Sequence, residues 1–354
     1  MKKELLMASA LVSTLGVASV AQAVTATMAG SMKIGAEFES ADDSTTDSNT
    51  VSDLSNFNIS LSETTDGGTT ISTSFEIVDE GTVSADDDNA IKLTFTDGSA
   101  LELLNAGNAA GTHAVAVPGA SGEQGVGGTT TNSAPGDIDF AAGSTALGVE
   151  WHSAADFLAD GLKMSASIST DNGAAKGETA RLENSWGLGA TYVTTAGDTT
   201  LTIGGGIADG EIANTGTQAS SDKGGFNLGV SAVTGDLTIG IGYGDGDSFA
   251  ANDAASTASN REFDGSVMKA GAKYVTGDLT LALGVTAGEA KDSDTFGTAG
   301  TNDDSTDSTS ASVTYAVASG VSAVVGYTTV DTNNEGVSTT DGGSAWYVGA
   351  TMSF

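Results

Sequence analysis

The chain has 354 residues, among them 49 glycines, two prolines, two histidines and no cysteine. With 12 Lys and Arg against 46 Asp and Glu, its formal net charge is −34, which opposes any binding to nucleic-acid phosphates. After residue 23 no apolar run approaches the ~18 residues of a membrane-spanning helix. Nucleic-acid partners and transmembrane helices are therefore excluded, and most catalytic or metal arrangements lack the residues they would need.

Residues 1–23 have the pattern of a cleaved secretory signal peptide. Lys2 and Lys3 precede an apolar stretch from Leu5 to Val20, and Ala21-Gln22-Ala23 forms the small-x-small pattern of a signal-peptidase site. An anchoring or buried helix is the alternative, but the stretch is short and Ser13, Thr14 and Gly16 interrupt it. We expect a signal peptide at 1–23 and one domain at 24–354.

The rest of the chain alternates between apolar and polar residues. From Met32 to Glu39, for example, Met32, Ile34 and Phe38 share one face, and Lys33 and Glu37 share the other. Such a segment is a strand with one wet face. Sixteen segments of this kind begin near residues 26, 51, 69, 90, 100, 145, 161, 185, 199, 224, 236, 265, 278, 309, 321 and 344.

The connections between these segments alternate in length. Seven are short and contain glycine, which is typical of tight hairpin turns: 65–68, 96–99, 160–161, 197–198, 235–236, 277–278 and 319–320. Eight are long: 41–50, 79–89, 107–144, 171–184, 209–223, 245–264, 289–308 and 331–343. An even number of strands with short turns on one rim and long loops on the other is the pattern of a transmembrane β-barrel.

A soluble solenoid or sandwich would use similar strands, but it would leave open sheet edges to protect. A closed barrel in lipid pairs every backbone group and has no edge. The export signal favours the barrel, as does the last strand, which alternates from Tyr347 to a terminal Phe354. This ending resembles the signal by which outer-membrane barrels are recognised, so Tyr347 and Phe354 are expected to engage the barrel assembly machinery.

On these features the chain from Thr25 to Phe354 resembles the general diffusion porins of Gram-negative outer membranes, especially the sixteen-stranded, acidic porins of alphaproteobacteria. The resemblance implies an all-β, sixteen-stranded antiparallel barrel in the outer membrane, assembled as a homotrimer. It also implies that the third long loop, 107–144, folds into the barrel as a constriction. That loop is the longest and contains both prolines, Pro118 and Pro135, which cannot donate to a sheet ladder. The Pro-Glu-Phe-Gly-Gly stretch of enterobacterial porins is absent from it.

Charged residues on the wet face of the strands are the candidate lining of the pore. The alternation places basic and acidic side chains there together: Lys33, Lys92, Lys163, Lys269, Lys273, Glu37, Glu39, Glu76, Glu102 and Glu150. The resemblance implies that acidic residues of the inserted loop, Glu123, Asp137 and Asp139, face basic groups of the wall. The transverse field would then screen solutes by charge and size. The alternative is that these charges only solvate the wet face of the barrel.

Acidic residues are dense in the long loops, above all at Asp86, Asp87 and Asp88 and at Asp303 and Asp304. Such carboxylates could hold Ca²⁺ loosely or bridge to lipopolysaccharide phosphates through divalent ions, and otherwise they are solvated loop residues. No other cofactor is expected.

An outer-membrane enzyme is disfavoured. The only histidines are His113, in the third loop, and His152, and the adjacent His152 and Ser153 would point to opposite faces of a strand. Two functions remain. The first is a weakly cation-selective channel for passive diffusion of ions and small hydrophilic solutes; the second is a structural or adhesive barrel that presents acidic loops. Loops of this length are too short for adhesive domains, which favours the channel.

Overall fold

The computed structural model describes residues 24–41, 48–79, 90–104, 107–119, 148–169, 181–213, 221–250, 261–292, 303–333 and 340–354. The predicted signal peptide at 1–23 lies outside these residues and remains a prediction. In the described part of the chain the only helix, α1 (Ala109–Thr112), is a single short turn, and no helix there is long and apolar enough to cross a membrane.

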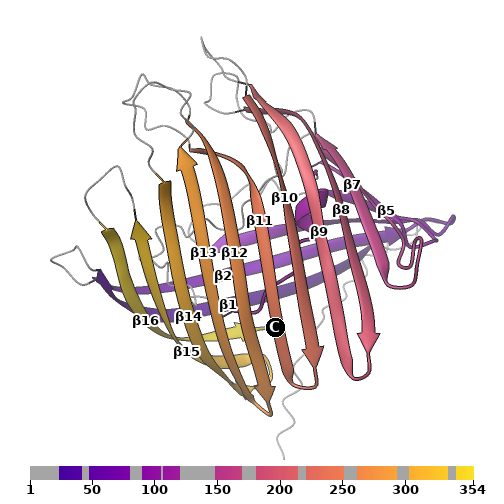
Figure 1. Cartoon of the computed structure of the whole chain (residues 1–354). Helices are drawn as coiled ribbons and strands as arrows, with labels where there is room; N and C mark the ends of the chain where they lie inside the picture. Colours follow the sequence, from indigo (N-terminus) through magenta and orange to yellow (C-terminus); the bar gives the residue numbers. More distant parts are fainter. Residues whose placement is uncertain are drawn as a thin grey trace, which may run out of the picture.

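The described residues form one closed antiparallel barrel of sixteen strands, as the sequence predicts (Figure 1). Each strand pairs with its neighbours in the chain, and β1 closes the barrel against β16. The strands are β1 (Thr25–Ala41), β2 (Ser48–Thr64), β3 (Thr70–Asp79), β4 (Ile91–Thr94), β5 (Ala100–Leu103), β6 (Gly148–His152), β7 (Leu162–Ser169), β8 (Arg181–Ala196), β9 (Thr199–Ala213), β10 (Ser221–Thr234), β11 (Leu237–Ala250), β12 (Arg261–Thr276), β13 (Leu279–Asp292), β14 (Asp303–Ala318), β15 (Val321–Asn333) and β16 (Thr340–Ser353).

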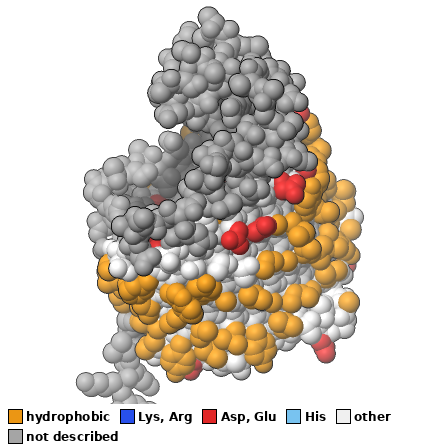
Figure 2. Space-filling view, turned by 60° about the vertical axis from the view of Figure 1, so that its left-hand side comes forward, with side chains coloured by type: hydrophobic (Ala, Val, Ile, Leu, Met, Phe, Trp, Pro, Cys, Tyr) orange, Lys and Arg blue, Asp and Glu red, His pale blue; other side chains and the backbone are white. Residues whose placement is uncertain are grey.

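The burial pattern of the barrel is inverted relative to that of a water-soluble protein. On β1, Ile34 and Phe38 are each 50% exposed, whereas Glu37, which lies between them, is 1% exposed. Figure 2 shows the same arrangement on one side of the barrel, where apolar side chains form a broad band and carboxylates appear near its edges. An exposed apolar surface of this size requires an apolar surrounding, which a lipid bilayer supplies.

Short turns join the strands at one end of the barrel, and each contains a glycine with positive φ. The seven glycines are Gly68, Gly98, Gly161, Gly197, Gly235, Gly277 and Gly320. At Gly161 the conformation is required twice, because φ is +79° and an added Cβ would collide with the carbonyl of Val193. All seven belong to the predicted turn sequences.

The connection between β6 and β7 is longer than the predicted turn at 160–161, because it spans residues 153–161. The Ser153 hydroxyl accepts a hydrogen bond from Met164 N (2.9 Å), and Asp156 adopts a φ of +60° while its carboxylate accepts one from Gly161 N (2.5 Å). Polar side chains therefore satisfy backbone groups that a two-residue hairpin would have paired in the ladder.

Several strands also extend further toward the long loops than their apolar pattern indicates. β11 continues to Ala250 and β14 begins at Asp303, inside segments that the sequence assigns to loops. Backbone pairing needs no apolar side chain once the strand has left the lipid, so a hydrophobic period of two cannot detect these ends.

Candidate functional site

The described part of the third long loop, residues 107–119, lies on the inner face of the barrel. It begins after β5, forms the turn α1 and contacts the inner faces of β7, β8, β9 and β10. The side chain of Asn108 caps α1 by accepting a hydrogen bond from Gly111 N (2.9 Å). The predicted insertion of this loop is therefore confirmed for residues 107–119.

Glycines of the inner wall make room for this segment. An added Cβ at Gly229 on β10 would lie 2.7 Å from Val115 Cβ, and one at Gly240 on β11 would lie 2.7 Å from Pro118 Cδ. We use the name glycine track for the inner-wall glycines over which residues 107–119 pass: Gly187, Gly189, Gly204, Gly206, Gly229, Gly240, Gly242 and Gly271. Because these positions lack a Cβ, the loop backbone lies directly against the sheet.

Two buried polar side chains hold the start of the loop. The carboxylate of Glu150 on β6, 3% exposed, accepts hydrogen bonds from Asn108 N (3.1 Å) and from the Thr112 hydroxyl (2.7 Å). Ser167 on β7 accepts one from Ala109 N (3.1 Å) and donates one to Gly107 O (2.8 Å). These contacts satisfy backbone groups that would otherwise be buried without partners.

The two histidines of the sequence, one on the loop and one on the wall, both contact the hydroxyl of Ser165. His113 is 6% exposed; its Nδ1 lies 2.7 Å from the Thr191 hydroxyl, and its Nε2 lies 2.8 Å from the Ser165 hydroxyl. The Nδ1 of His152 on β6 lies 2.9 Å from the same Ser165 hydroxyl, and its Nε2 faces Glu102 Oε1 at 3.4 Å. One serine therefore bridges the loop histidine and the wall histidine.

A Ser-His-Glu arrangement invites comparison with a hydrolase triad, and it involves Ser165 rather than the neighbouring Ser153. Ser165 is 4% exposed, and an imidazole stands on each side of its hydroxyl. A nucleophile needs an open approach for the carbonyl it attacks and donors for the developing oxyanion. This hydroxyl has no such approach, and its contacts connect the loop to the wall.

The predicted lumen residues on the strands all lie on the inner face of the barrel. Lys92 and Glu102 are directly opposite each other on β4 and β5 and form an ion pair of 2.6 Å. Asn56 donates a hydrogen bond to Glu76 across β2 and β3. The remaining lumen residues are identified as inward-facing by alternation with neighbours whose orientation is established: Lys33, Glu37, Lys163, Lys269 and Lys273.

Some predicted site residues lie outside the described residues. For others the backbone is described but the side chain is not. Glu123, Asp137 and Asp139 of the third loop, with Pro135, belong to the first group, as do Asp86, Asp87 and Asp88. Asp303 and Asp304 lie at the start of β14 rather than in a loop, and nothing is described of their side chains. Within the described residues no group of three His, Asp or Glu is arranged to hold a metal ion, and the calcium sites remain predictions.

The two residues of the predicted assembly signal have different surroundings. Tyr347 points inward and is 3% exposed, and its ring occupies the place that a Cβ at Gly326 would take. Phe354 is 71% exposed, and its backbone exchanges two hydrogen bonds with Gly30 while its ring covers that glycine on the outer face. The terminal residue thus adds a last rung to the closure between β1 and β16.

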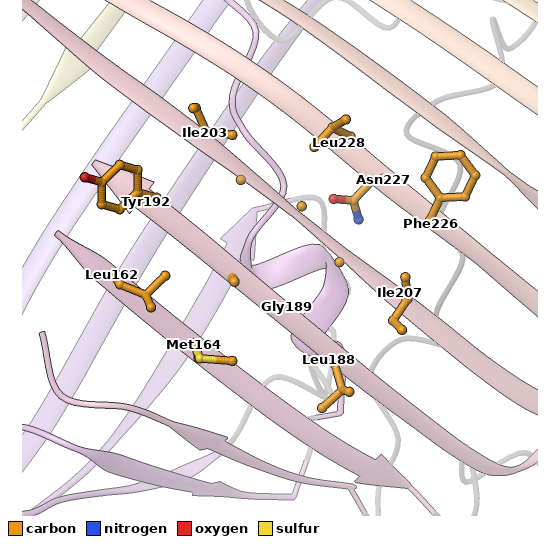
Figure 3. A pocket seen from close by; sticks show the side chains of 14 residues that line it. Leu162, Met164, Leu188, Gly189, Tyr192, Ile203, Ile207, Phe226, Asn227 and Leu228 are labelled. Carbon is orange, nitrogen blue, oxygen red and sulfur yellow. The ribbon is translucent and has the colours of Figure 1, made fainter. Parts of the chain in front are cut away.

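A shallow apolar groove of about 540 Å³ lies on the outer face of β7–β10, on the side of the wall opposite to α1 (Figure 3). The groove is bordered by Leu188, Tyr192, Ile207 and Phe226. Gly205 lies at its base, where the absence of a side chain leaves space. Its lining contains no ionisable group except the tyrosine phenol, in keeping with the apolar band around it.

Reasoning from the sequence missed the glycine track and the bridge through Ser165. The signal for the track is the run of glycines at inward positions of neighbouring strands, such as Gly204, Gly206, Gly240 and Gly242. A polar-face glycine that recurs at every second residue indicates that something other than solvent occupies its place. No local pattern indicates that residues 113, 152 and 165 meet, because that contact depends on the path of the loop.

A closed sixteen-stranded barrel with an apolar exterior, a polar interior and a loop inserted from its wall defines the architecture of an outer-membrane pore protein. Residues 8–335 match the family model described as Gram-negative porin. The chain therefore belongs to the Gram-negative porin family and is a β-barrel protein of the outer membrane.

Solved structures with the same fold share little sequence with it. An anion-selective porin from Comamonas acidovorans is 11% identical with a TM-score of 0.63, over 94% of this chain and 100% of that one. A porin refined at 1.8 Å is 17% identical with a TM-score of 0.61, over 93% and 100%. The trimer form of OmpT, an outer membrane protein of Vibrio cholerae, is 15% identical with a TM-score of 0.58, over 94% and 100%. A comparison with curated proteins finds no significant match.

Proposed function

We propose that this porin forms a water-filled channel for passive diffusion of ions and small hydrophilic solutes, and that it is not an enzyme. The observation that carries the proposal is the position of residues 107–119 against the inner wall of the barrel. A loop in this position would reduce the open cross-section of the barrel. Water and small solutes would pass between this segment and the opposite strands. Charged side chains on the inner wall would screen those solutes by sign and size.

The test is reconstitution of the purified protein into planar bilayers and into liposomes. We expect stepwise conductance in KCl and osmotic swelling in small sugars, with swelling that slows as the sugar grows. A barrel that serves only to anchor its loops would insert and show neither. That outcome would favour the structural or adhesive function, in which the acidic loops are the active part.

The proposal includes a weak preference for cations. Acidic residues are dense in the long loops, and these loops would concentrate cations at the mouth within about a Debye length of ~8 Å at physiological salt. The preference should therefore weaken as salt rises. The Comamonas porin shares the fold and is anion-selective, so fold does not decide selectivity. A reversal potential indicating anion preference in dilute KCl would contradict this part of the proposal.

We also propose that three barrels associate, as the trimer form of OmpT illustrates for this fold. Ala26 lies on the outer face of β1, where its small side chain would let a neighbouring barrel approach, although the ring of Phe354 covers Gly30 on that face. Cross-linking in mild detergent should give a trimer band, and monomers alone would count against it. Contacts of the acidic loops with lipopolysaccharide, directly or through Ca²⁺, belong to the same proposal.

A further inference from the structure

The hydroxyl of Ser165 lies between two imidazoles, one on the inserted loop and one on the wall. A hydroxyl has one hydrogen to donate, so it donates to one ring nitrogen and accepts from the other. With both rings neutral, Thr191 can donate to His113 Nδ1, His113 Nε2 to Ser165, and Ser165 to His152 Nδ1. The Nε2 proton of His152 then points toward Glu102, which Lys92 also binds. With both histidines neutral, each hydrogen bond through Ser165 therefore has one donor and one acceptor, and His152 Nε2 faces Glu102 at 3.4 Å without a hydrogen bond.

Protonation of both histidines disrupts this arrangement. Each ring nitrogen beside Ser165 would carry a hydrogen, and two cations would face each other across one hydroxyl. Lys163 of β7 adds a third positive charge near His113. The carboxylates of Glu102 and Glu150 would attract a protonated His152, whose Nδ1 lies 3.7 Å from Glu150 Oε1. Glu150 is also the acceptor for Asn108 N and Thr112, so attraction to a charged His152 competes with its hold on the loop.

We propose that His113, His152 and Ser165 are positioning residues for the inserted loop, and that their common protonation releases residues 107–119 from the wall. This inference rests on the proposed channel function. In this inference the two histidines control whether residues 107–119 stay against the wall, and the proton is the ligand that they bind.

The direction of the effect follows from the burial of His113. Burial lowers the pKa of His113 from its ordinary value, and a positive charge on His152, when that ring is protonated, or on Lys163 lowers it further. The seated loop therefore favours the neutral ring, whereas a released loop would allow the ordinary pKa of about 6.5. Seating is undisturbed above that value and is progressively weakened as the pH falls below it. Carboxylates of ordinary pKa titrate near pH 4, so the interval from about pH 7.5 to 5 lies above their range and tests the protonation of His113.

The experiment is the pH profile of single-channel current in planar bilayers between pH 7.5 and 5. For the natural chain we expect a second conductance level, or at least a roughly threefold rise in current fluctuations, as the pH falls through this interval. The double variant His113→Asn/His152→Asn contains no imidazole, and its current should be the same across the interval. Ser165→Ala keeps both histidines but removes the shared hydroxyl, so its fluctuations should already be raised at pH 7.5.

The outcomes separate this inference from the channel function. If the natural chain conducts and its pH profile matches that of the double variant, the histidine inference is wrong and the channel function stands. If neither protein conducts after its barrel has been verified by circular dichroism, the proposed function is wrong, and the histidine inference fails with it. A rise in fluctuations that persists in the double variant would assign the pH response to other groups and overturn the inference.

Discussion

Two sectors of the inner wall, β7 to β12 and β1 to β6, differ in the residues that point inward. From β7 to β12 the inward positions are rich in glycine, and residues 107–119 lie over them. From β1 to β6 the inward positions carry ionisable side chains, among them Glu37, Glu76, Lys92 and Glu102. Residues 107–119 pack against the first sector. The ionisable side chains of the second sector point into the barrel. An inward glycine of the glycine track therefore marks a position that other protein atoms cover.

The largest expected effect on conductance comes from shortening the third long loop, which covers the glycine track. Shortening the third loop between Gly111 and Gly136 should raise conductance by about twofold or more and admit larger sugars, because the passage widens while no rung of the ladder is lost. A deletion of similar kind in the connection 251–260 serves as the control and should leave the conductance near that of the natural chain. Equal conductance in both deletions would mean that the third loop does not narrow the passage.

A smaller effect is expected from filling the glycine track. Gly229→Leu combined with Gly240→Leu places side chains where Val115 and Pro118 lie. The segment should lift, and each seating hydrogen bond lost should cost about 1 kcal/mol, which lowers the unfolding temperature in detergent. Ala272→Leu, on the outer face opposite Ile239 and Leu283, is the matched control and should unfold at the natural temperature. The same unfolding temperature for all three proteins would contradict the assigned seat.

Substitutions of the ionisable inward side chains of β1 to β6 should affect ion selectivity more than stability. Glu37→Gln combined with Glu76→Gln keeps shape and removes two negative charges from the inner wall, so the reversal potential in a dilute KCl gradient should shift toward lower cation preference. The amide variants of Glu123, Asp137 and Asp139 test, by the same reversal potential, whether the inserted loop contributes to the cation preference. A set of variants with the natural reversal potential would mean that the loops at the mouth alone set the selectivity.

The smallest effect is expected at the pair of Lys92 and Glu102. The side chain of Lys92 is 44% exposed, and pairs this open to solvent contribute less than about 1 kcal/mol. Lys92→Met should therefore leave unfolding in detergent nearly unchanged and slightly raise the cation preference. A large loss of stability would show that the pair is part of a tighter network with His152 than its exposure suggests.

Local patterns sufficed to predict the strand number, the barrel closure and the turns, because lipid outside and water inside impose a strict alternation at positions such as Ile34 and Glu37. They failed where polar strand ends leave the lipid, as at Asp303, and where Ser153 and Asp156 reshape the connection after β6. The candidate lumen residues follow from the same alternation. The meeting of His113 with Ser165 could not be predicted, since the two are brought together by the path of a loop that alternation does not describe.

The position of the loop in the passage can be tested most directly at Ala116. Val115 and Val117 lie against glycines of the track, and Ala116 between them is exposed on the side facing away from the wall. Because the chain has no cysteine, Ala116→Cys provides a unique thiol for a bulky, charged, water-soluble reagent. The account predicts that each modification lowers the single-channel current in a discrete step, whereas modification of Asp236→Cys in the β10–β11 turn leaves the current unchanged. A current that stays constant while Cys at position 116 is fully modified would contradict the placement of this loop in the conducting path.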